Sequence, residues 1–382
     1  MKTFKYALIQ ILFCAVICAI SGYATVFLLD KQFTNTIIGT TLSLSNILGV
    51  LLQQLIATFV DNSHGKIKAR HVVLTMFMIM SVCSILLYFI KGSSFIFLGL
   101  FIIIFLLMGA LNPFINQMVF EVDQEGKEIN FGLARGMGSA SYAIASLVLG
   151  NLTASYGTNW LPLLYLGFAL LAFVVCFFFD SKEETVYEVK EEKIKDQTNF
   201  FKKYPLLTKV FIGVILIFFG FNTCNSYLIQ IVRNVGGTQS HLGMAMFLAA
   251  IVELPAMSIC AKLIDKHGYS KMMMIAAIFF GIKNTLLWVA PNIIVVYISQ
   301  LLQFFSYAFF LPVSVYYVKD HVESYDAMKG QALMTGSISL GGVFAGVISG
   351  ALLDLVGVSS TLLVATIVTW VGALLLIRLM KK

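Results

Sequence analysis

The chain has 382 residues, of which 59% are hydrophobic and 12% charged, and its formal net charge is +7. Soluble domains carry about 25% charged residues and are about 45–50% apolar, so the composition excludes an ordinary soluble enzyme, a disordered protein and a soluble domain with one anchor. A basic balance can indicate nucleic-acid binding, but basic residues of membrane proteins usually gather in cytoplasmic loops. We therefore expect a polytopic membrane protein that does not bind nucleic acid.

Twelve apolar runs are long enough to cross a bilayer, which takes about 20 residues as a helix. They lie at residues 6–29, 37–60, 71–90, 95–121, 131–154, 160–179, 206–231, 241–264, 272–290, 292–317, 331–354 and 359–379. The first follows Lys2 and Lys5, as a signal peptide would, but its apolar stretch exceeds the roughly 7–15 residues of a signal-peptide core. We expect this span to remain in the mature protein.

The distribution of Lys and Arg predicts the orientation of these spans. If the N-terminus lies in the cytoplasm, most of the 26 Lys and Arg residues fall in cytoplasmic segments, and the opposite side holds only Lys31, Lys91 and Arg233. Because basic residues favour the cytoplasmic side, both termini are expected to be cytoplasmic, in a multi-pass protein of the cytoplasmic membrane.

The longest polar stretch divides the twelve runs into two sets of six. Its mixed Lys and Glu residues favour a solvated linker or surface helix over a docking site. We expect a first six-helix bundle at 1–179, a cytoplasmic linker at 180–205 and a second six-helix bundle at 206–382. Two equal halves are typical of a parallel internal repeat, so the predicted fold is all-α, with twelve transmembrane helices in two pseudo-repeat bundles.

A weak sequence repeat supports this division. After the second span comes Asp61, then Gly65 and the base Lys68, and after the eighth span comes Asp265, followed by Gly268. Each place combines an acid, a Gly that can turn the chain sharply and nearby bases, in a predicted cytoplasmic connection.

This pattern resembles the signature of the major facilitator superfamily, Gly-x-x-x-Asp-x-x-Gly followed by a base. Ala57 replaces the first Gly, and one extra residue separates the acid from the second Gly. The resemblance implies the major facilitator fold and a gating role for the five residues of the repeat, in which the acid meets bases and the positive end of a neighbouring helix. The alternative is that both acids are merely solvated loop residues.

Charged side chains inside the spans need an explanation, because a charge in hydrocarbon costs a few kcal/mol or more. On the fifth span, Arg135 lies on one helical face with Ser139, Tyr142 and Ser146. Small residues on an adjoining face, among them Gly136, favour close helix packing. Further polar stripes, including Gln300, Gln303 and Tyr307 on the tenth span, are expected to line a wet central cavity, although interhelical hydrogen bonding alone is the alternative.

Neutral amides, hydroxyls and aromatic rings around a few charges suit a small polyhydroxylated solute. Residues 130–142, NFGLARGMGSASY, resemble the Phe-Gly-x-Ala-Arg run of the oligosaccharide:proton symporters, the lactose permease-like family. The resemblance implies that Arg135 binds sugar hydroxyls and that Tyr142 stacks under the ring, while Gln117 occupies the place of the family's sugar-binding glutamate. The predicted substrate-binding set is Arg135, Tyr142, Gln117, Ser139, Asn222, Asn225 and Tyr23.

In the second half, Glu253 resembles the family's mid-helix glutamate on span eight, and Lys283 lies where the family has an arginine on span nine. Asn222 and Asn225 keep the spacing of two aspartates on span seven but are neutral, and the family's His and Glu on span ten and Lys on span eleven have no counterparts. We therefore assign proton coupling to Glu253 with Lys283, since burial raises a carboxyl pKa and a nearby ammonium lowers it. A static Glu253–Lys283 pair and direct substrate binding by Glu253 are the alternatives.

The sequence thus predicts a secondary transporter, a monomer in the lipid bilayer, that moves a sugar or similar solute by alternating access with proton symport. The alternatives are an exporter or importer of another small organic solute, such as a nucleoside, an aromatic acid or a drug, and a membrane sensor that does not transport. No Walker loop, zinc-protease motif or nucleophile elbow occurs, so we expect neither an enzyme nor a bound cofactor or metal.

Overall fold

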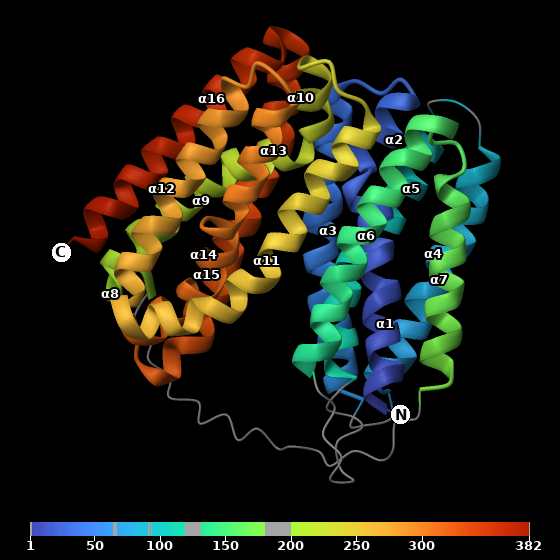
Figure 1. Cartoon of the computed structure of the whole chain (residues 1–382). Helices are drawn as coiled ribbons and strands as arrows, with labels where there is room; N and C mark the ends of the chain where they lie inside the picture. The colour runs from blue at the N-terminus through green and yellow to red at the C-terminus, as the bar shows by residue number, and fades with distance from the viewer. Residues whose placement is uncertain are drawn as a thin grey trace. The chain divides into compact units, whose positions relative to one another are not determined.

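The computed structural model describes residues 2–63, 67–90, 92, 94–118, 131–179 and 200–381. These residues form helices joined by short connections, and no strand occurs among them (Figure 1). Eight helical stretches in these ranges are long and apolar enough to cross a membrane. The all-α membrane fold class is therefore confirmed. The count of twelve crossings stays a prediction, because several of the expected spans are broken into shorter helices.

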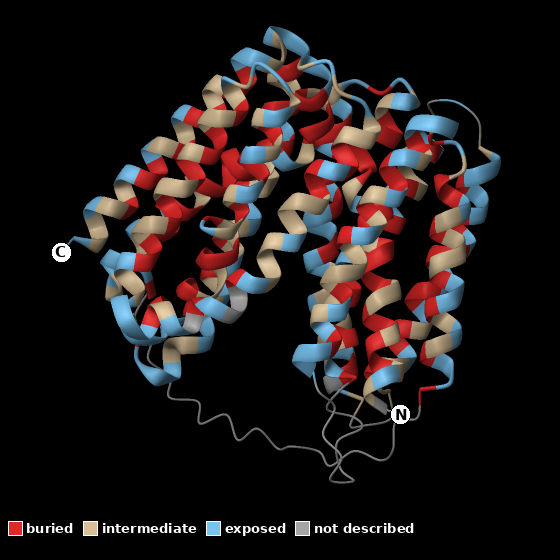
Figure 2. Cartoon of the chain, in the orientation of Figure 1, coloured by how far each residue is buried: buried red, intermediate tan, exposed pale blue. Residues whose placement is uncertain are grey.

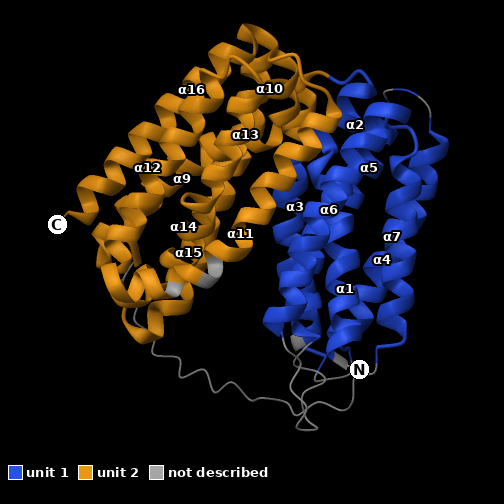
Figure 3. Cartoon of the chain, viewed as in Figure 1, with its two compact units in different colours: residues 1–33, 41–189 blue, residues 34–40, 190–382 orange. Residues whose placement is uncertain are grey.

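The chain divides into two compact units, residues 1–33 with 41–189 and residues 34–40 with 190–382 (Figure 3). The first unit contains α1 (Lys2–Ile17), the π-helical turn η1 (Cys18–Gly22), α2 (Ala24–Asp30), most of α3 (Asn35–Asp61), α4 (Ala69–Phe89), α5 (Phe95–Gln117), α6 (Phe131–Tyr156) and α7 (Leu161–Phe177). Residues 180–199 of the expected linker lie outside the described residues, and its end is helical at Phe200–Lys203.

The second unit contains residues 34–40 and the described helices from Phe200 onward. These are α8 (Phe200–Lys203), α9 (Pro205–Ser226), α10 (Leu228–Asn234), α11 (Gln239–His267), α12 (Tyr269–Trp288), α13 (Ile293–Leu301), the 3₁₀ turn η3 (Leu302–Phe304), α14 (Tyr307–His321), the 3₁₀ turn η4 (Ser324–Asp326), α15 (Ala327–Phe344), the π-helical turn η5 (Ala345–Ser349) and α16 (Gly350–Met380). Gly357, with φ 77°, divides α16 at a kink.

The same packing pattern occurs inside each unit. In the first unit α1 packs on α6 and α7, and α4 packs on α5 and α7; in the second unit α9 packs on α15 and α16, and α12 packs on α14 and α16. The first, third, fourth, fifth and sixth expected spans of each half therefore have corresponding neighbours, as a parallel repeat requires.

Local sequence explains where several helices begin and end. The Ser94 hydroxyl accepts a hydrogen bond from the N–H of Phe97, and the Asn292 side chain accepts from the N–H groups of Ile294 and Val295, as N-cap residues do. Pro205 begins α9, where its missing N–H costs nothing. Gly268, with φ 77°, joins α11 to α12.

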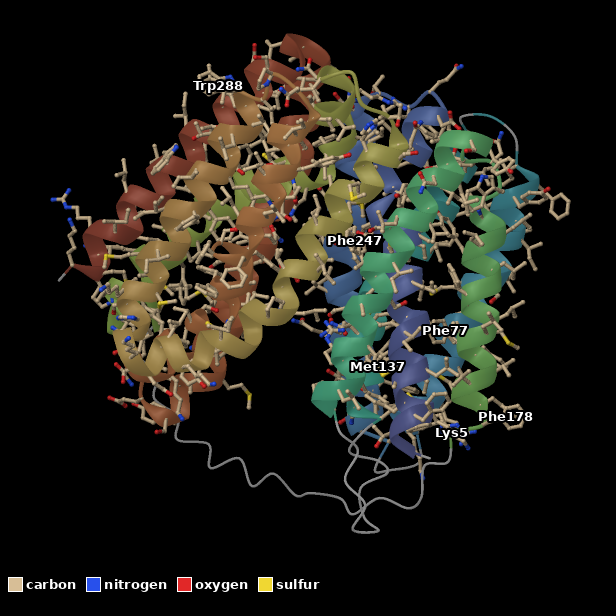
Figure 4. The ribbon with its side chains drawn as sticks, viewed as in Figure 1. Lys5, Phe77, Met137, Phe178, Phe247 and Trp288 are labelled. Carbon is tan, nitrogen blue, oxygen red and sulfur yellow. The ribbon has the colours of Figure 1, made fainter. Side chains whose placement is uncertain are left out.

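Buried residues gather where the helices of a unit face one another, and exposed residues lie mainly on the outer faces (Figure 2). Many outer side chains are large and apolar, such as Phe95, which is 93% exposed, and Leu55, which is 69% exposed. At one end of the first unit, Lys5 donates a hydrogen bond to the carbonyl oxygen of Phe178 at 3.0 Å (Figure 4). Apolar outer faces with a basic residue at a helix end suit a protein solvated by lipid.

Candidate functional site

A polar stripe on α1 forms the buried part of the candidate site in the first unit. Tyr6, Gln10 and Cys14 follow one another at intervals of four residues, so they share one helical face. The Gln10 Nε2 atom donates to the Tyr6 hydroxyl at 2.7 Å and to Asn116 Oδ1 on α5 at 3.2 Å. Gln10 is fully buried, and its Oε1 atom has no hydrogen-bond partner. The stripe therefore joins α1 to α5 and leaves one buried acceptor unused.

Arg135 on α6 lies beside this stripe. Its side chain is exposed, and its Nη1 atom lies 4.0 Å from the sulfur of Cys14. The guanidinium thus lies beside the Tyr6–Cys14 end of the stripe, with which it also interacts electrostatically. A guanidinium offers five donors in a rigid fork, which suits neighbouring hydroxyl or carboxylate oxygens.

The other residues predicted for α6 lie on the same helix face as Arg135. The Ser139 hydroxyl donates to the Arg135 carbonyl oxygen at 3.5 Å, and both Ser139 and Tyr142 are half-buried. Gln117, the last residue of α5, is exposed. These positions are compatible with the predicted binding set, which stays a prediction.

The prediction for Tyr23 is not supported by its geometry. Its ring is fully buried, and its hydroxyl donates to the carbonyl oxygen of Ser146 at 2.7 Å. Tyr23 lies where the first span breaks between η1 and α2. The phenol therefore braces this break against α6, and a buried, saturated donor is not available to a solute.

The packing glycine on α6 also differs from the one predicted. A Cβ atom on Gly138 would lie 2.9 Å from the Cys14 sulfur and 3.1 Å from the Gln10 carbonyl oxygen, whereas one on Gly136 would meet nothing within 4 Å. The missing side chain of Gly138 is what lets α6 approach α1.

In the second unit, Gln303 bridges the two residues predicted for proton coupling. The Lys283 ammonium donates to Gln303 Oε1, and Gln303 Nε2 donates to Glu253 Oε1 at 3.0 Å. Lys283 is fully buried, Gln303 is 5% exposed, and Glu253 is half-buried. The amide orientation is fixed by its neighbours, because a flipped amide would set its N–H₂ group against the ammonium and its oxygen against the carboxylate. We call these three residues the relay.

Two aromatic rings lie beside the relay. The Lys283 Nζ atom is 5.1 Å from the centre of the Phe221 ring, and Phe221 stacks on Tyr307 with ring centres 5.0 Å apart and planes 8° apart. The ring face gives the buried ammonium a second favourable contact. The relay thus combines two charges, an amide and an aromatic wall.

The position of Gln303 depends on a break in the tenth expected span. This span consists of α13, the 3₁₀ turn η3 and α14, and Gln303 is the middle residue of η3. Local departures from α-helical geometry often occur at functional sites, and transporters use discontinuous helices to build midplane sites. The break therefore brings an amide from span ten between side chains of α11 and α12.

The two asparagines predicted on α9 differ in their surroundings. Asn222 is half-buried, and its Nδ2 atom donates to the Phe218 carbonyl oxygen at 2.8 Å, whereas Asn225 is exposed. The Asn222 amide oxygen and the Asn225 side chain are the parts of this pair that a solute could use.

Only part of the predicted gate falls within the described residues. Asp61 ends α3, but its side chain and Gly65 lie outside the described part of the chain, and Lys68 directly precedes α4. In the second unit Asp265 is exposed in the last turn of α11, and Gly268 makes the following turn with φ 77°. The Gly therefore turns the chain as expected, and the gating role stays a prediction.

Gln10 and Gln303 belong to the site in the structure but to neither the predicted substrate-binding set nor the predicted proton-coupling pair. Gln10 is a lone amide inside an apolar run on the first span, and the cost of an amide in lipid could have marked it. Gln303 stood in a polar stripe, but nothing in the helical spacing indicated the 3₁₀ turn that aims it between Lys283 and Glu253.

Two units of apolar helices with the same internal packing, each with a polar cluster on its helices, define a multi-pass membrane transporter. The model of the MFS_1-like family matches residues 3–364. The chain belongs to this family, so the resemblance to the major facilitator superfamily is confirmed, and the protein is a transporter rather than an enzyme.

Known proteins agree with this assignment over the whole chain. The maltose permease of Geobacillus stearothermophilus is 23% identical over 380 residues, covering 92% of this chain and 88% of that protein. The structure of nucleoside transporter NupG is similar with a TM-score of 0.83 at 13% identity, covering 99% of this chain and 98% of that one. The D-xylose-proton symporter gives a TM-score of 0.70 at 15% identity, covering 98% and 96%. These two structures support the fold alone.

Proposed function

We propose that this transporter moves a sugar or a similar small polyhydroxylated solute across the cytoplasmic membrane by alternating access, coupled to proton symport. The observation that carries the solute class is the exposed guanidinium of Arg135, on one face of α6 with Ser139 and Tyr142. These groups offer a rigid fork of donors, a hydroxyl and a half-buried ring, which together suit a molecule with many hydroxyls and an apolar face. The similarity to a maltose permease over 92% of this chain supports this class.

The relay supports coupling to protons. Glu253 is a half-buried carboxylate that accepts a hydrogen bond from Gln303, and Lys283 on the far side of that amide is fully buried. When Glu253 takes up a proton, its negative charge disappears, and the relay loses the charge that balances the buried ammonium. Protonation of Glu253 therefore changes the electrostatic energy of the relay.

We further propose that both termini face the cytoplasm and that the protein acts as a monomer in the bilayer. The basic residues of the predicted cytoplasmic loops support the orientation. A protease or an impermeant label applied to sealed inverted vesicles should reach both ends of the chain.

The direct test is solute flux in proteoliposomes. Purified protein should exchange labelled maltose for internal maltose, and an inward proton gradient should drive maltose uptake against its concentration. D-xylose and uridine serve as parallel probes, and a thermal-shift screen of sugars, nucleosides and organic acids extends the set, because a bound solute stabilises the folded state. Binding of a sugar without any flux would show that the protein is a sensor. Flux of uridine but of neither sugar would show that the solute is a nucleoside rather than a sugar.

A further inference from the structure

Gln303 is the uncharged member of the relay, and its amide faces a charge at each end. It accepts a hydrogen bond from the Lys283 ammonium through Oε1, and it donates to Glu253 Oε1 through Nε2 at 3.0 Å. A primary amide suits this position because it offers an acceptor and a donor on neighbouring atoms. A Met side chain could bond neither ion, and a second carboxylate would neutralise the ammonium. The amide therefore binds both ions and neutralises neither of them.

Lys283 thus reaches Glu253 through this amide rather than in a direct ion pair. The attraction between opposite charges falls with distance and is weakly screened in a protein interior. A direct pair would therefore hold Glu253 in its charged form more strongly than the bridged pair does. The buried ammonium keeps two contacts when Glu253 takes up a proton, namely the Gln303 oxygen and the face of the Phe221 ring. The bridge therefore lets the carboxyl group titrate while the ammonium stays bound.

The titratable groups around the relay come from several helices of the second unit. The Lys283 ammonium interacts electrostatically with Glu253 and with the Cys224 thiol of α9, and Tyr307 of α14 stacks on the neighbouring Phe221 ring. The other titratable groups of α11 lie at least nine residues from Glu253, or roughly 14 Å along the helix axis. The further titratable groups on α11 and on the helices that pack against it are His241, Lys262, Asp265, Lys266 and His267 on α11, Arg233 on α10, Tyr269 and Lys271 on α12, Tyr297 on α13, and Tyr316, Tyr317, Lys319, Asp320 and His321 on α14.

We propose that Gln303 is a positioning residue, which holds Lys283 apart from Glu253 and thereby sets the pH at which Glu253 takes up the transported proton. This inference rests on the proposed proton symport, but its first test needs neither solute nor flux. It also gives a role to the 3₁₀ turn η3, because that turn places an uncharged amide from span ten between the two ions. A bridge with a structural role alone would affect stability without moving the pH of protonation.

Infrared spectroscopy of the purified full-length protein tests the separation, because a protonated carboxyl group and a carboxylate absorb at different frequencies. The signal that is lost when Glu253→Gln is added to each protein identifies the titration of Glu253. In Gln303→Ala the flexible Lys283 side chain can reach the carboxylate directly, so the midpoint of this titration should fall by about one pH unit or more. In Gln303→Glu the introduced carboxylate binds the ammonium and repels Glu253, so the midpoint should rise by about one pH unit or more.

Two further variants separate this role from a general disturbance of the fold. Lys283→Met removes the ammonium, so adding Gln303→Ala to it should not lower the midpoint. Cys224→Ser is the matched control, since it changes another neighbour of Lys283 at nearly constant size and should leave the midpoint unchanged. Opposite shifts in the two Gln303 variants support the proposal. It is overturned by no shift, by shifts of both variants in one direction, or by an undiminished fall in the Lys283→Met background. If Gln303→Ala does not fold, Gln303→Ser replaces it.

The pH dependence of proton-driven maltose uptake in proteoliposomes is the second readout. The pH of half-maximal uptake should move toward acid in Gln303→Ala and toward alkali in Gln303→Glu, in step with the infrared midpoints. Uptake with an unchanged pH profile in both variants would show that Gln303 does not act on coupling, and would leave the transport function standing. Opposite infrared shifts without flux of any probe would support the separation of the charges and reject the proposed transport function.

Discussion

Tyr23 and Tyr227 occupy matching positions in the two units. Each lies where the first long helix of its unit breaks, with φ −108° and ψ 9° at Tyr23 and φ −112° and ψ 23° at Tyr227. Tyr23 donates to the Ser146 carbonyl oxygen of α6 at 2.7 Å, and Tyr227 to the Gly346 carbonyl oxygen of η5 at 3.0 Å. In both units a buried phenol therefore braces a broken helix against the fifth expected span.

Replacing Tyr23 with Phe should lower the stability of the protein by about 0.5–1.5 kcal/mol, because it removes one buried hydrogen bond and leaves the Ser146 carbonyl oxygen without this donor. Thermal unfolding in detergent measures the change. Tyr165→Phe is the control, since the buried Tyr165 hydroxyl has no partner and its loss should not destabilise. Equal effects of the two substitutions would contradict the bracing role.

Arg135→Lys should weaken solute binding roughly 10-fold to 100-fold, because Lys is a point charge and cannot form two parallel hydrogen bonds to neighbouring oxygens. Concentration-dependent maltose counterflow in proteoliposomes measures the affinity. Arg233→Lys, at an exposed arginine of α10, should leave the affinity unchanged. An unaltered affinity in Arg135→Lys removes this residue from the binding set.

Glu253→Gln should keep maltose counterflow and lose uphill accumulation. The amide retains the shape and the hydrogen-bond acceptor of Glu253 but cannot carry the exchanged proton. Counterflow and proton-driven uptake are compared in the same vesicles. Normal accumulation against a gradient would exclude Glu253 from coupling, and loss of both activities would favour the alternatives of a structural pair or a direct solute ligand.

Gln303→Met should destabilise the protein by about 1–3 kcal/mol, because it removes the bridge between a buried ammonium and a carboxylate while keeping a similar volume. The double variant Lys283→Met/Gln303→Met should regain stability, since no buried charge is then left without its acceptor. Gln331→Met is the control, as Gln331 is half-buried and donates only to a backbone carbonyl oxygen, that of Val315, among the described residues. Additive losses in the double variant would show that the relay is not a coupled unit.

Lys203 gathers a charged cluster that should respond to pH. Its Nζ atom lies 3.3 Å from Glu323 Oε2 and 3.1 Å from Asp326 Oδ2. Hydrogen bonds from Tyr325 and then from Lys203 lower the pKa of Glu323. Because the pKa of Glu323 is lower in the folded state, the ionised carboxylate stabilises the fold at pH values above the ordinary Glu pKa. This stabilisation is lost as the pH falls through the pKa of the folded state.

The unfolding temperatures of the unsubstituted protein and Glu323→Gln should therefore differ at pH 7 and converge as the pH falls below about 4. The difference should be small and should shrink in high salt, because Glu323 is exposed. A constant difference at all pH values would show that the charge of Glu323 is not what matters.

The sequence was sufficient for the fold class, because lengths of apolar runs follow directly from bilayer thickness. It also placed Arg135, Ser139 and Tyr142 on one face, since helical spacing alone decides that. It could not identify Gln303 as the bridge, because a 3₁₀ turn inside an apolar helix leaves no periodic signal. Nor could the sequence show that Gly138, rather than Gly136, is the glycine at the packing contact, because the two differ only in how closely α1 approaches them.

Each unit has the same helix neighbours, a tyrosine that braces a broken first helix, and the break itself, so one unit can serve as an internal control for the other. An ancestral six-helix segment that was duplicated would leave such counterparts, so each experiment on one half has a natural replicate in the other. Where the halves respond differently to equivalent substitutions, as a comparison of Tyr23→Phe with Tyr227→Phe would reveal, that divergence marks the positions at which each copy acquired its own task.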